Sequence, residues 1–248
     1  MERITSRQNQ IITHMRKLSA DSGYRRERGE YVCDGLKMLK EAADSNAEIS
    51  CVLWSEKPEF ELPEIIQYCA PPELVGYVSS MKNSPGPVFT VRMPDTEADQ
   101  MFGRVIILEG VQDPGNVGTV LRTAGAFGID AVILTGGCAD IYNPKTVRST
   151  MGAVFRQRVI EAELPQIVEL MEENSLTLYG AALTEDAVEL GAFELGKCAV
   201  AIGSEGRGLS SELLNMCSRR IIIPMDEKCE SLNASIAASI IMWEMRRK

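Results

Sequence analysis

The stretch that decides the fold spans residues 105–134 and reads VIILEGVQDPGNVGTVLRTAGAFGIDAVIL. Short apolar runs at 105–108 and 131–134 enclose a segment whose apolar residues recur at helical spacing, namely Val117, Val120, Leu121, Ala124 and Phe127. Asn116 stands at the expected N-cap position, and Gly128 follows the last turn. The pattern predicts a strand, a helix and a second strand, the unit from which parallel sheets are built.

The same alternation continues towards the carboxyl end. Further strands are expected at 156–160, 176–181, 198–202 and 220–223, with helical spacing between them. A sheet built from such units is mainly parallel and is covered by helices on both faces. The predicted class is therefore α/β.

A second, smaller α/β region precedes this one. Helices are expected at 4–18, 35–43 and 61–69, and strands at 31–33, 49–54, 74–78 and 88–91. An acidic, proline-containing stretch interrupts the apolar periodicity between the two regions. The sequence therefore predicts a domain at 1–92, a linker at 93–103 and a second domain at 104–248.

Composition is that of an ordinary water-soluble chain. The 248 residues are 45% hydrophobic, but no apolar run reaches the roughly 18 residues of a membrane span, and the amino end is polar. We therefore expect a cytoplasmic protein without a membrane partner. The seven cysteines form no CxxC pair, which argues against a disulfide framework and against a zinc site, so no metal is expected.

Charge is distributed unevenly. The net charge is -9, yet residues 1–30 hold seven Lys or Arg against four Asp or Glu, and residues 143–158 hold four Lys or Arg and no acid. Composition alone favours ordinary solvated helix faces. Local basic patches nevertheless keep an RNA partner possible.

Two more blocks of small residues follow predicted strands. Gly203-Ser-Glu-Gly-Arg-Gly208 has neither the Gly-Lys-Ser/Thr of a Walker loop nor the spacing of a dinucleotide fingerprint. The third block runs from Pro224 to Asn233 and leads into a helix with one apolar stripe of Leu232, Ile236, Ile240 and Trp243. Because open α/β sheets bind ligands at the carboxyl ends of their strands, we expect the three loops to converge.

Local chemistry allows a plain structural interpretation of the polar residues in these blocks. Asn116, Ser231 and Asn233 are good helix caps, and an arginine such as Arg122 is commonly a solvated charge. The alternative interpretation is an anion site, because a helix N-terminus attracts phosphate and Arg122 adds a forked donor.

In their fixed order, the three blocks resemble the SpoU (TrmH-like) family of SPOUT RNA 2′-O-ribose methyltransferases over residues 105–243. Asn116 and Arg122 match the family's first motif, Glu205 the second, and Ser231-Leu232-Asn233 the third. Residues 142–152 resemble the intervening motif. Residues 1–92 resemble, more weakly, the RNA-binding domain related to ribosomal protein L30 that is often fused in front.

This resemblance implies a trefoil-knotted sheet, a homodimer that completes the site, and S-adenosylmethionine as the cofactor. It assigns catalytic roles to Asn116, Arg122, Glu205, Ser231 and Asn233, and cofactor contacts to Gly203, Ile223 and Leu232. The amino-terminal domain would select the RNA through Arg7, Arg16, Lys17, Arg25 and Arg26, with Lys145 and Arg148 extending the track. The fused small domain favours ribosomal RNA over tRNA as the substrate.

The implied reaction transfers a methyl group to a ribose 2′-oxygen. A guanidinium has a pKa above about 12, so we expect Arg122 to stabilise the developing alkoxide rather than to act as a simple base. Glu205 would orient Arg122 or its own loop.

One position departs from the family pattern. The family usually has glycine two residues after the Pro-Met of the third motif, where this chain has Glu227. A non-catalytic RNA-binding or ribosome-assembly protein that has lost its cofactor is therefore an alternative. A small-molecule enzyme with an anionic substrate at the Asn116 helix is a third possibility, but it leaves the basic amino-terminal segment unexplained.

Overall fold

A computed structural model describes residues 1–55, 58, 62–81, 86–94, 101–226, 228–229 and 231–247. The chain forms two compact units, Met1–Asp95 with Asp140–Phe155, and Thr96–Ala139 with Arg156–Lys248. Residues 140–155 thus group with the amino-terminal unit, although the sequence analysis placed them in the domain at 104–248. Glu227 lies outside the described residues.

The carboxyl-terminal unit is built on a parallel sheet. Its seven strands lie in the order β10-β12-β9-β11-β6-β7-β8, and neighbouring strands are parallel. They are β6 Arg104–Glu109, β7 Ala131–Thr135, β8 Val159–Glu161, β9 Thr177–Ala181, β10 Val188–Glu189, β11 Cys198–Gly203 and β12 Arg219–Ile222. The predicted mainly parallel α/β sheet is confirmed.

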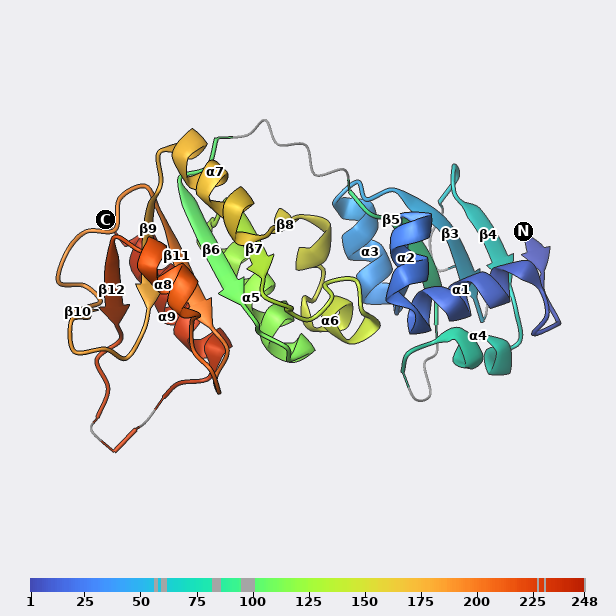
Figure 1. The fold of residues 1–248 in the computed structure, drawn as a ribbon. Helices are drawn as coiled ribbons and strands as arrows, with labels where there is room; N and C mark the ends of the chain where they lie inside the picture. Colours follow the sequence, from blue (N-terminus) through green and yellow to red (C-terminus); the bar gives the residue numbers. More distant parts are fainter. Residues whose placement is uncertain are drawn as a thin grey trace. The chain divides into compact units, whose positions relative to one another are not determined.

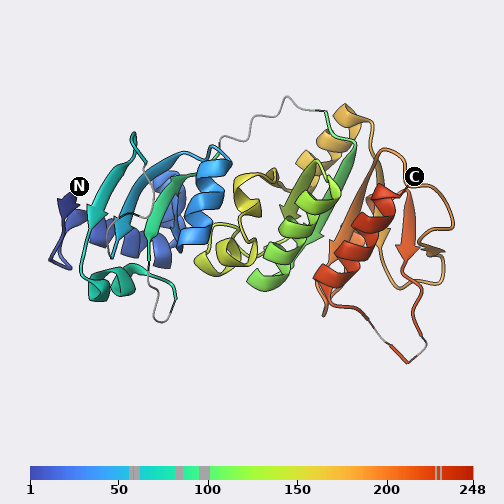
Figure 2. The ribbon, with the colours of Figure 1, turned by 180° about the vertical axis from the view of Figure 1, so that it is seen from behind.

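Helices cover both faces of this sheet (Figure 1). Helices α5 (Pro114–Phe127) and α9 (Ala234–Arg246) lie side by side on one face, as Figure 2 shows from behind. Helices α7 (Leu164–Asn174) and α8 (Ser211–Met216) pack on the other face through a core that includes Ile107, Ile133, Ala201, Ile167 and Leu213. Because both faces are covered, the central strands are continuous apolar runs.

The amino-terminal unit is built on a mixed sheet of order β1-β4-β3-β5-β2. Its strands are β1 Glu2–Arg3, β2 Glu30–Asp34, β3 Ile49–Trp54, β4 Ile66–Cys69 and β5 Val88–Arg92. Strand β5 is antiparallel to β2 and β3, whereas β4 is parallel to β3 and β1.

Side chains of this mixed sheet alternate between two cores. Val52 and Trp54 of β3 pack in the core of α3 (Leu36–Asp44), α6 (Pro144–Ser149) and η1 (Ala153–Phe155). Cys51 and Leu53 belong to the core of α1 (Gln10–Ala20) and α4 (Pro72–Val78). Helix α2 (Ser22–Arg28) follows α1. The period-two alternation is the direct consequence of strand geometry.

Three local predictions in this unit were wrong. The expected helix at 61–69 contains strand β4, and the expected strand at 74–78 is part of helix α4. Pro72 occupies the first turn of α4, where its missing N–H costs nothing, and Leu74, Val75 and Val78 are buried along one helix face. Helix α1 begins at Gln10 instead of Ile4 because the Asn9 side chain caps it by accepting from the Ile11 N–H.

Among the described residues, every helix is too short or too polar to span a lipid bilayer.

Candidate active site

The loops that follow β6, β11 and β12 meet at the carboxyl edge of the parallel sheet. Asn116 Nδ2 donates to Glu205 Oε1 at 3.1 Å, and Asn233 Nδ2 donates to the same oxygen at 2.6 Å. Asn233 Nδ2 also lies 3.0 Å from Asn116 Oδ1, to which it donates. One predicted residue from each block therefore contributes to a single cluster, the Asn116–Glu205–Asn233 cluster.

Asn116 enters this cluster because it is not a helix cap, contrary to the sequence prediction. Asp113 is the N-cap of α5, and its carboxylate accepts from the Asn116 N–H at 2.9 Å. Pro114 then occupies the first helical turn, for which its fixed φ is suited. With the cap supplied by Asp113, the Asn116 side-chain amide bonds to Glu205 and Asn233 instead.

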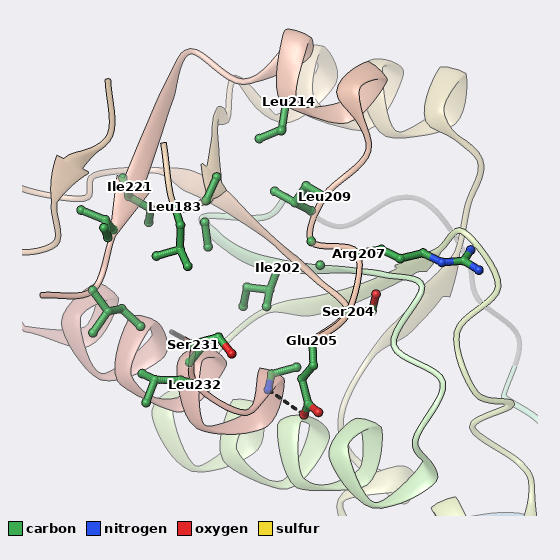
Figure 3. Close-up of a pocket in the computed structure, with 18 of the residues that line it drawn as sticks. Leu183, Ile202, Ser204, Glu205, Arg207, Leu209, Leu214, Ile221, Ser231 and Leu232 are labelled. Atoms are coloured by element: carbon green, nitrogen blue, oxygen red, sulfur yellow. Dashed lines mark hydrogen bonds between the residues drawn. The ribbon is translucent and has the colours of Figure 1, made fainter. Parts of the chain in front are cut away.

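Asn233 is both a cap and a member of the cluster. Its Oδ1 accepts from the N–H groups of Ser235 at 3.0 Å and Ile236 at 3.3 Å, while its Nδ2 faces Glu205. The predicted cap role is confirmed. Glu205 Oε1 also accepts from the Ala234 N–H at 3.2 Å, as Figure 3 shows. The carboxylate therefore lies at the positive N-terminal end of α9, where a negative charge is stabilised.

The loop that carries Glu205 folds back on itself. Gly208 N–H donates to Ser204 O at 2.8 Å, and Gly208 has φ +64°. A Cβ added to Gly203 would lie 2.1 Å from the carbonyl carbon of Gly208. Glycine at 203 is thus required by close backbone approach.

Glu109 is a site residue that the sequence analysis did not select. Its Oε2 accepts from the Ser210 N–H, and its Oε1 accepts from Ser210 Oγ, both at 2.7 Å. Ser210 also caps α8 by accepting from the Leu213 N–H. The carboxylate ties the far end of the glycine loop to β6. The available signal was a carboxylate at the carboxyl end of an otherwise apolar strand.

A cavity of about 350 Å³ lies between the second and third blocks (Figure 3). Its walls are mainly apolar and include Leu183, Ile202, Leu209, Leu214 and Ile221. The predicted cofactor residues Gly203, Ile223 and Leu232 all line it, as does Ser231. Ser231 does not cap α9, because Asn233 holds that position. Arg207 also contributes to the lining, but its guanidinium extends away from the apolar side chains in Figure 3.

A second cavity of about 510 Å³ adjoins the first and is lined by more polar groups. Glu109, Gln112, Asp113 and Asn116 contribute to it. The two cavities share Glu205 and its neighbours in the glycine loop. Glu205, the acceptor at the centre of the Asn116–Glu205–Asn233 cluster, therefore lies at the boundary between an apolar and a polar space.

Arg122 is not part of this cluster in its own chain. It is exposed on α5, six residues after Asn116, which rotates its side chain about 240° from that of Asn116 at about 100° per residue. Among the described residues, no hydrogen bond joins the Arg122 side chain to Glu205. The role of Glu205 in orienting Arg122 or its own loop stays a prediction.

The predicted RNA contacts all lie in the amino-terminal unit. Arg7, Arg16, Lys17, Arg26, Lys145 and Arg148 are exposed. Arg25 is not suited to this role, because it is only 3% exposed. Its guanidinium donates to Leu18 O at 2.6 Å and to Asp140 Oδ2 at 2.5 Å, so its function is to hold two segments of the unit together.

The carboxyl edge of this parallel sheet carries the motifs of one class of RNA-modifying enzymes. The sequence model of the SpoU rRNA methylase family matches residues 103–243, which is more than half of the chain. The chain belongs to this family, and the resemblance found in the three blocks is confirmed.

Individual relatives extend the similarity over the whole chain. A 23S rRNA (guanosine(2553)-2′-O)-methyltransferase of Bacillus subtilis, RlmP, is 30% identical over 99% of this chain and 100% of its own length. A 23S rRNA (uridine(2479)-2′-O)-methyltransferase of Streptomyces viridochromogenes is 27% identical over 99% of this chain and 92% of its own. A solved S-adenosylmethionine-bound rRNA methyltransferase from Sinorhizobium meliloti shares the fold, with a TM-score of 0.87, 24% identity, and coverage of 99% of this chain and 97% of that one.

Proposed function

We propose that this chain transfers a methyl group from S-adenosylmethionine to a ribose 2′-hydroxyl of ribosomal RNA. The observation that carries the proposal is the Asn116–Glu205–Asn233 cluster, whose Glu205 lines both of two adjoining cavities. One cavity would hold the cofactor and the other the acceptor nucleotide.

The first cavity suits S-adenosylmethionine. Its volume of about 350 Å³ is within the usual range of small-molecule sites. Apolar side chains would cover the adenine and the carbon chain, while backbone groups at Gly203, Ile223 and Leu232 would bind the polar edges. When bound, the cofactor supplies an electrophilic methyl group on a sulfonium.

The second cavity suits the hydroxyl groups of the acceptor ribose, because its lining is polar. Glu205 is held by three donors, the side chains of Asn116 and Asn233 and the Ala234 N–H, so its carboxylate is fixed before the RNA arrives. Fixed groups of this kind lower a barrier because they need no reorganisation in the transition state. Asn116 would position the 2′-hydroxyl, with Ser231 at the neighbouring cavity wall.

We propose that Arg122 acts in the active site of a partner subunit. Ile236 and Trp243 on α9 are 51% and 52% exposed, and α9 lies beside the helix that carries Arg122. A homodimer that buries this apolar surface would bring Arg122 to an interface, from which it would stabilise the alkoxide and the adjacent phosphate. We also propose that the parallel sheet of this chain contains the trefoil knot of the family.

The proposed substrate is 23S rRNA, for which both cited relatives are named. One of those relatives modifies a guanosine and the other a uridine. Base identity is therefore expected to be read outside the common motifs. The amino-terminal unit, proposed to be an L30-like RNA-binding domain, carries exposed cations for this purpose. We propose that the protein acts in the cytoplasm, where its substrate is assembled.

Calorimetric titration with S-adenosylmethionine tests the proposal, followed by ribose methylation mapping of rRNA from cells that lack the protein. Saturable binding and one missing 2′-O-methyl group are expected. The Glu227→Gly variant distinguishes the methyltransferase from the non-catalytic alternative. If only this variant bound S-adenosylmethionine, the natural chain would be a non-catalytic RNA-binding protein. No binding by either form would contradict the cofactor assignment.

A further inference from the structure

Tyr77 is an exposed aromatic residue on the outer side of α4. Its neighbours Leu74, Val75 and Val78 are buried against α1, whereas Tyr77 is 37% exposed. Ser19 Oγ of α1 donates to Val78 O at 3.2 Å and fixes the end of α4. The tyrosine therefore stands on a rigid support and contributes little to the core.

Two guanidinium groups lie over the Tyr77 ring. The Arg7 Cζ is 4.8 Å from the ring centroid, and the Arg16 Cζ is 5.2 Å from it. These distances are within the range of cation–π attraction. The ring thus gathers two cations from the segment before α1 and from α1 itself.

Neither cation is paired with a carboxylate of the described residues. Within the described part of the chain, no carboxylate forms an ion pair with Arg7 or Arg16, whereas Arg25 and Arg92 each have one. Each guanidinium has five N–H donors in one plane, which can serve phosphate oxygens. A base that stacks on Tyr77 must displace a guanidinium from that ring face, and the displaced group can then donate to a phosphate oxygen beside the ring.

A nearby aromatic residue shows a different arrangement. Lys17 and Arg28 lie over the Tyr24 ring, but the Tyr24 hydroxyl is bonded to His14 Nδ1 at 2.9 Å and its ring meets the His14 ring edge-on. Tyr24 is thus engaged by the protein. Tyr77 is the better candidate for an external ligand.

We propose that Tyr77 is a stacking site for one unpaired nucleobase, and that Arg7 and Arg16 bind the phosphates beside that base. This inference rests on the RNA partner of the proposed function. Bases of a continuous duplex are stacked on each other, so an aromatic platform selects a loop, a bulge or a single strand. Every base has a π-face, so the site recognises unpaired structure and not sequence.

The test measures RNA binding by the full chain with fluorescence anisotropy. The ligands are a hairpin with an unpaired loop and a blunt duplex of the same length and charge. Tyr77→Leu is expected to bind the hairpin about tenfold more weakly, because it removes base–aromatic stacking. Tyr77→Phe is the matched control and should bind within about twofold of the wild type, since the ring is kept.

Salt dependence and a local probe distinguish stacking from charge. Tyr77→Leu should keep the wild-type slope of log K against log salt, whereas Arg7→Gln should reduce that slope by about 0.7. A 2-aminopurine in the loop should be quenched by the wild type and by Tyr77→Phe, but not by Tyr77→Leu.

If Tyr77→Leu bound the hairpin as tightly as the wild type, the stacking site would be refuted. The proposed RNA partner would not be affected, since the protein would still bind RNA. An equal loss in Tyr77→Phe, or an equal loss on hairpin and duplex, would also overturn it. If the wild type bound neither RNA, the proposed RNA partner would fail together with the stacking site.

Discussion

Gly203 and Gly208 approach so closely that a Cβ on Gly203 would lie 2.1 Å from the Gly208 carbonyl carbon. The contact closes the loop that carries Glu205, and residues of this loop line both cavities of the candidate site. The geometry of the proposed cofactor site thus depends on the absence of a Cβ at Gly203.

Gly203→Ala is therefore expected to weaken S-adenosylmethionine binding by at least about tenfold, because the added methyl group must displace backbone. Gly206→Ala is the matched control in the same loop. A Cβ at Gly206 meets no atom within 4 Å, so binding should be nearly unchanged. Calorimetric titration of both variants checks this, and similar affinities in the two would refute the close-approach argument.

Asn116 should affect the reaction and not the binding of the cofactor. It lines the second cavity but not the first, and it donates one of the bonds that fix Glu205. We expect Asn116→Ala to lower kcat about 100-fold, as loss of one preorganised donor does in other enzymes. Its affinity for S-adenosylmethionine should stay within about twofold.

The control for this variant is Thr119→Ala, since Thr119 is exposed one turn further along α5. Methyl transfer to rRNA and cofactor titration are measured for both variants. A parallel loss of cofactor affinity in Asn116→Ala would show that the cluster shapes the first cavity instead.

Glu109 and Ser210 should be coupled in stability. Glu109→Gln leaves one acceptor where the carboxylate received two bonds, and Ser210→Ala removes one of those bonds and the cap of α8. Each change should lower the free energy of unfolding by about 1–2 kcal/mol. Urea unfolding of the single and double variants measures the coupling. Additive losses would mean that the two residues act independently.

The convergence of the three blocks could be predicted, because parallel strands end at one edge of a sheet. The N-cap residue of α5 was harder to predict from the sequence, since Asp113 and Asn116 both have a side chain that can cap a helix. Pro114 was the discriminating signal, because proline favours the first helical position after a cap. Because Asp113 is the cap, the Asn116 side chain can bond to Glu205 and Asn233. The periodicity of apolar residues does not reveal these bonds.

Other features depend on contacts between residues distant in sequence. Arg25 belongs to a basic run, and its burial and its bond to Asp140, 115 positions away, show that it is structural. The same separation in sequence explains why local patterns do not reveal that residues 140–155 group with the amino-terminal unit. The Glu109–Ser210 bonds span 101 positions and were equally inaccessible to local patterns.

Trp243 should control the oligomeric state. It is 52% exposed on α9 and makes an edge contact with Phe127 of α5. A charge placed in the proposed interface must be desolvated without a partner, so Trp243→Glu is expected to convert a dimer into a monomer. Light scattering coupled to size exclusion measures this. Val168→Glu is the control, because Val168 is 37% exposed on α7 across the sheet; a monomeric wild type would contradict the proposed dimer.

Glu30 should stabilise the amino-terminal unit only above mildly acidic pH. The Glu30 carboxylate lies 2.8 Å from His14 Nε2 and also accepts from Ser50, and the His14 bond is the main cause that lowers the pKa of Glu30 below 4.5. The folded state favours the ionised carboxylate. The contribution of Glu30 to stability is therefore complete above the pKa that the group has in the unfolded chain, and it is lost as the pH falls through the lower pKa of the folded state. Glu30→Gln should therefore reduce the free energy of unfolding by about 1–2 kcal/mol at pH 7, and by much less at pH 3.

The matched control for this pH dependence is Glu48→Gln. Glu48 pairs with Arg92 at 2.8 Å, but the two side chains are 73% and 55% exposed, so solvent screens the pair and little change is expected at either pH. Urea unfolding of the wild type and both variants at pH 7 and pH 3 makes the comparison. If Glu30→Gln lowered the free energy of unfolding as much at pH 3 as at pH 7, the effect would be assigned to packing. Ionisation of the Glu30 carboxyl could not then be the origin of the greater stability of the wild type.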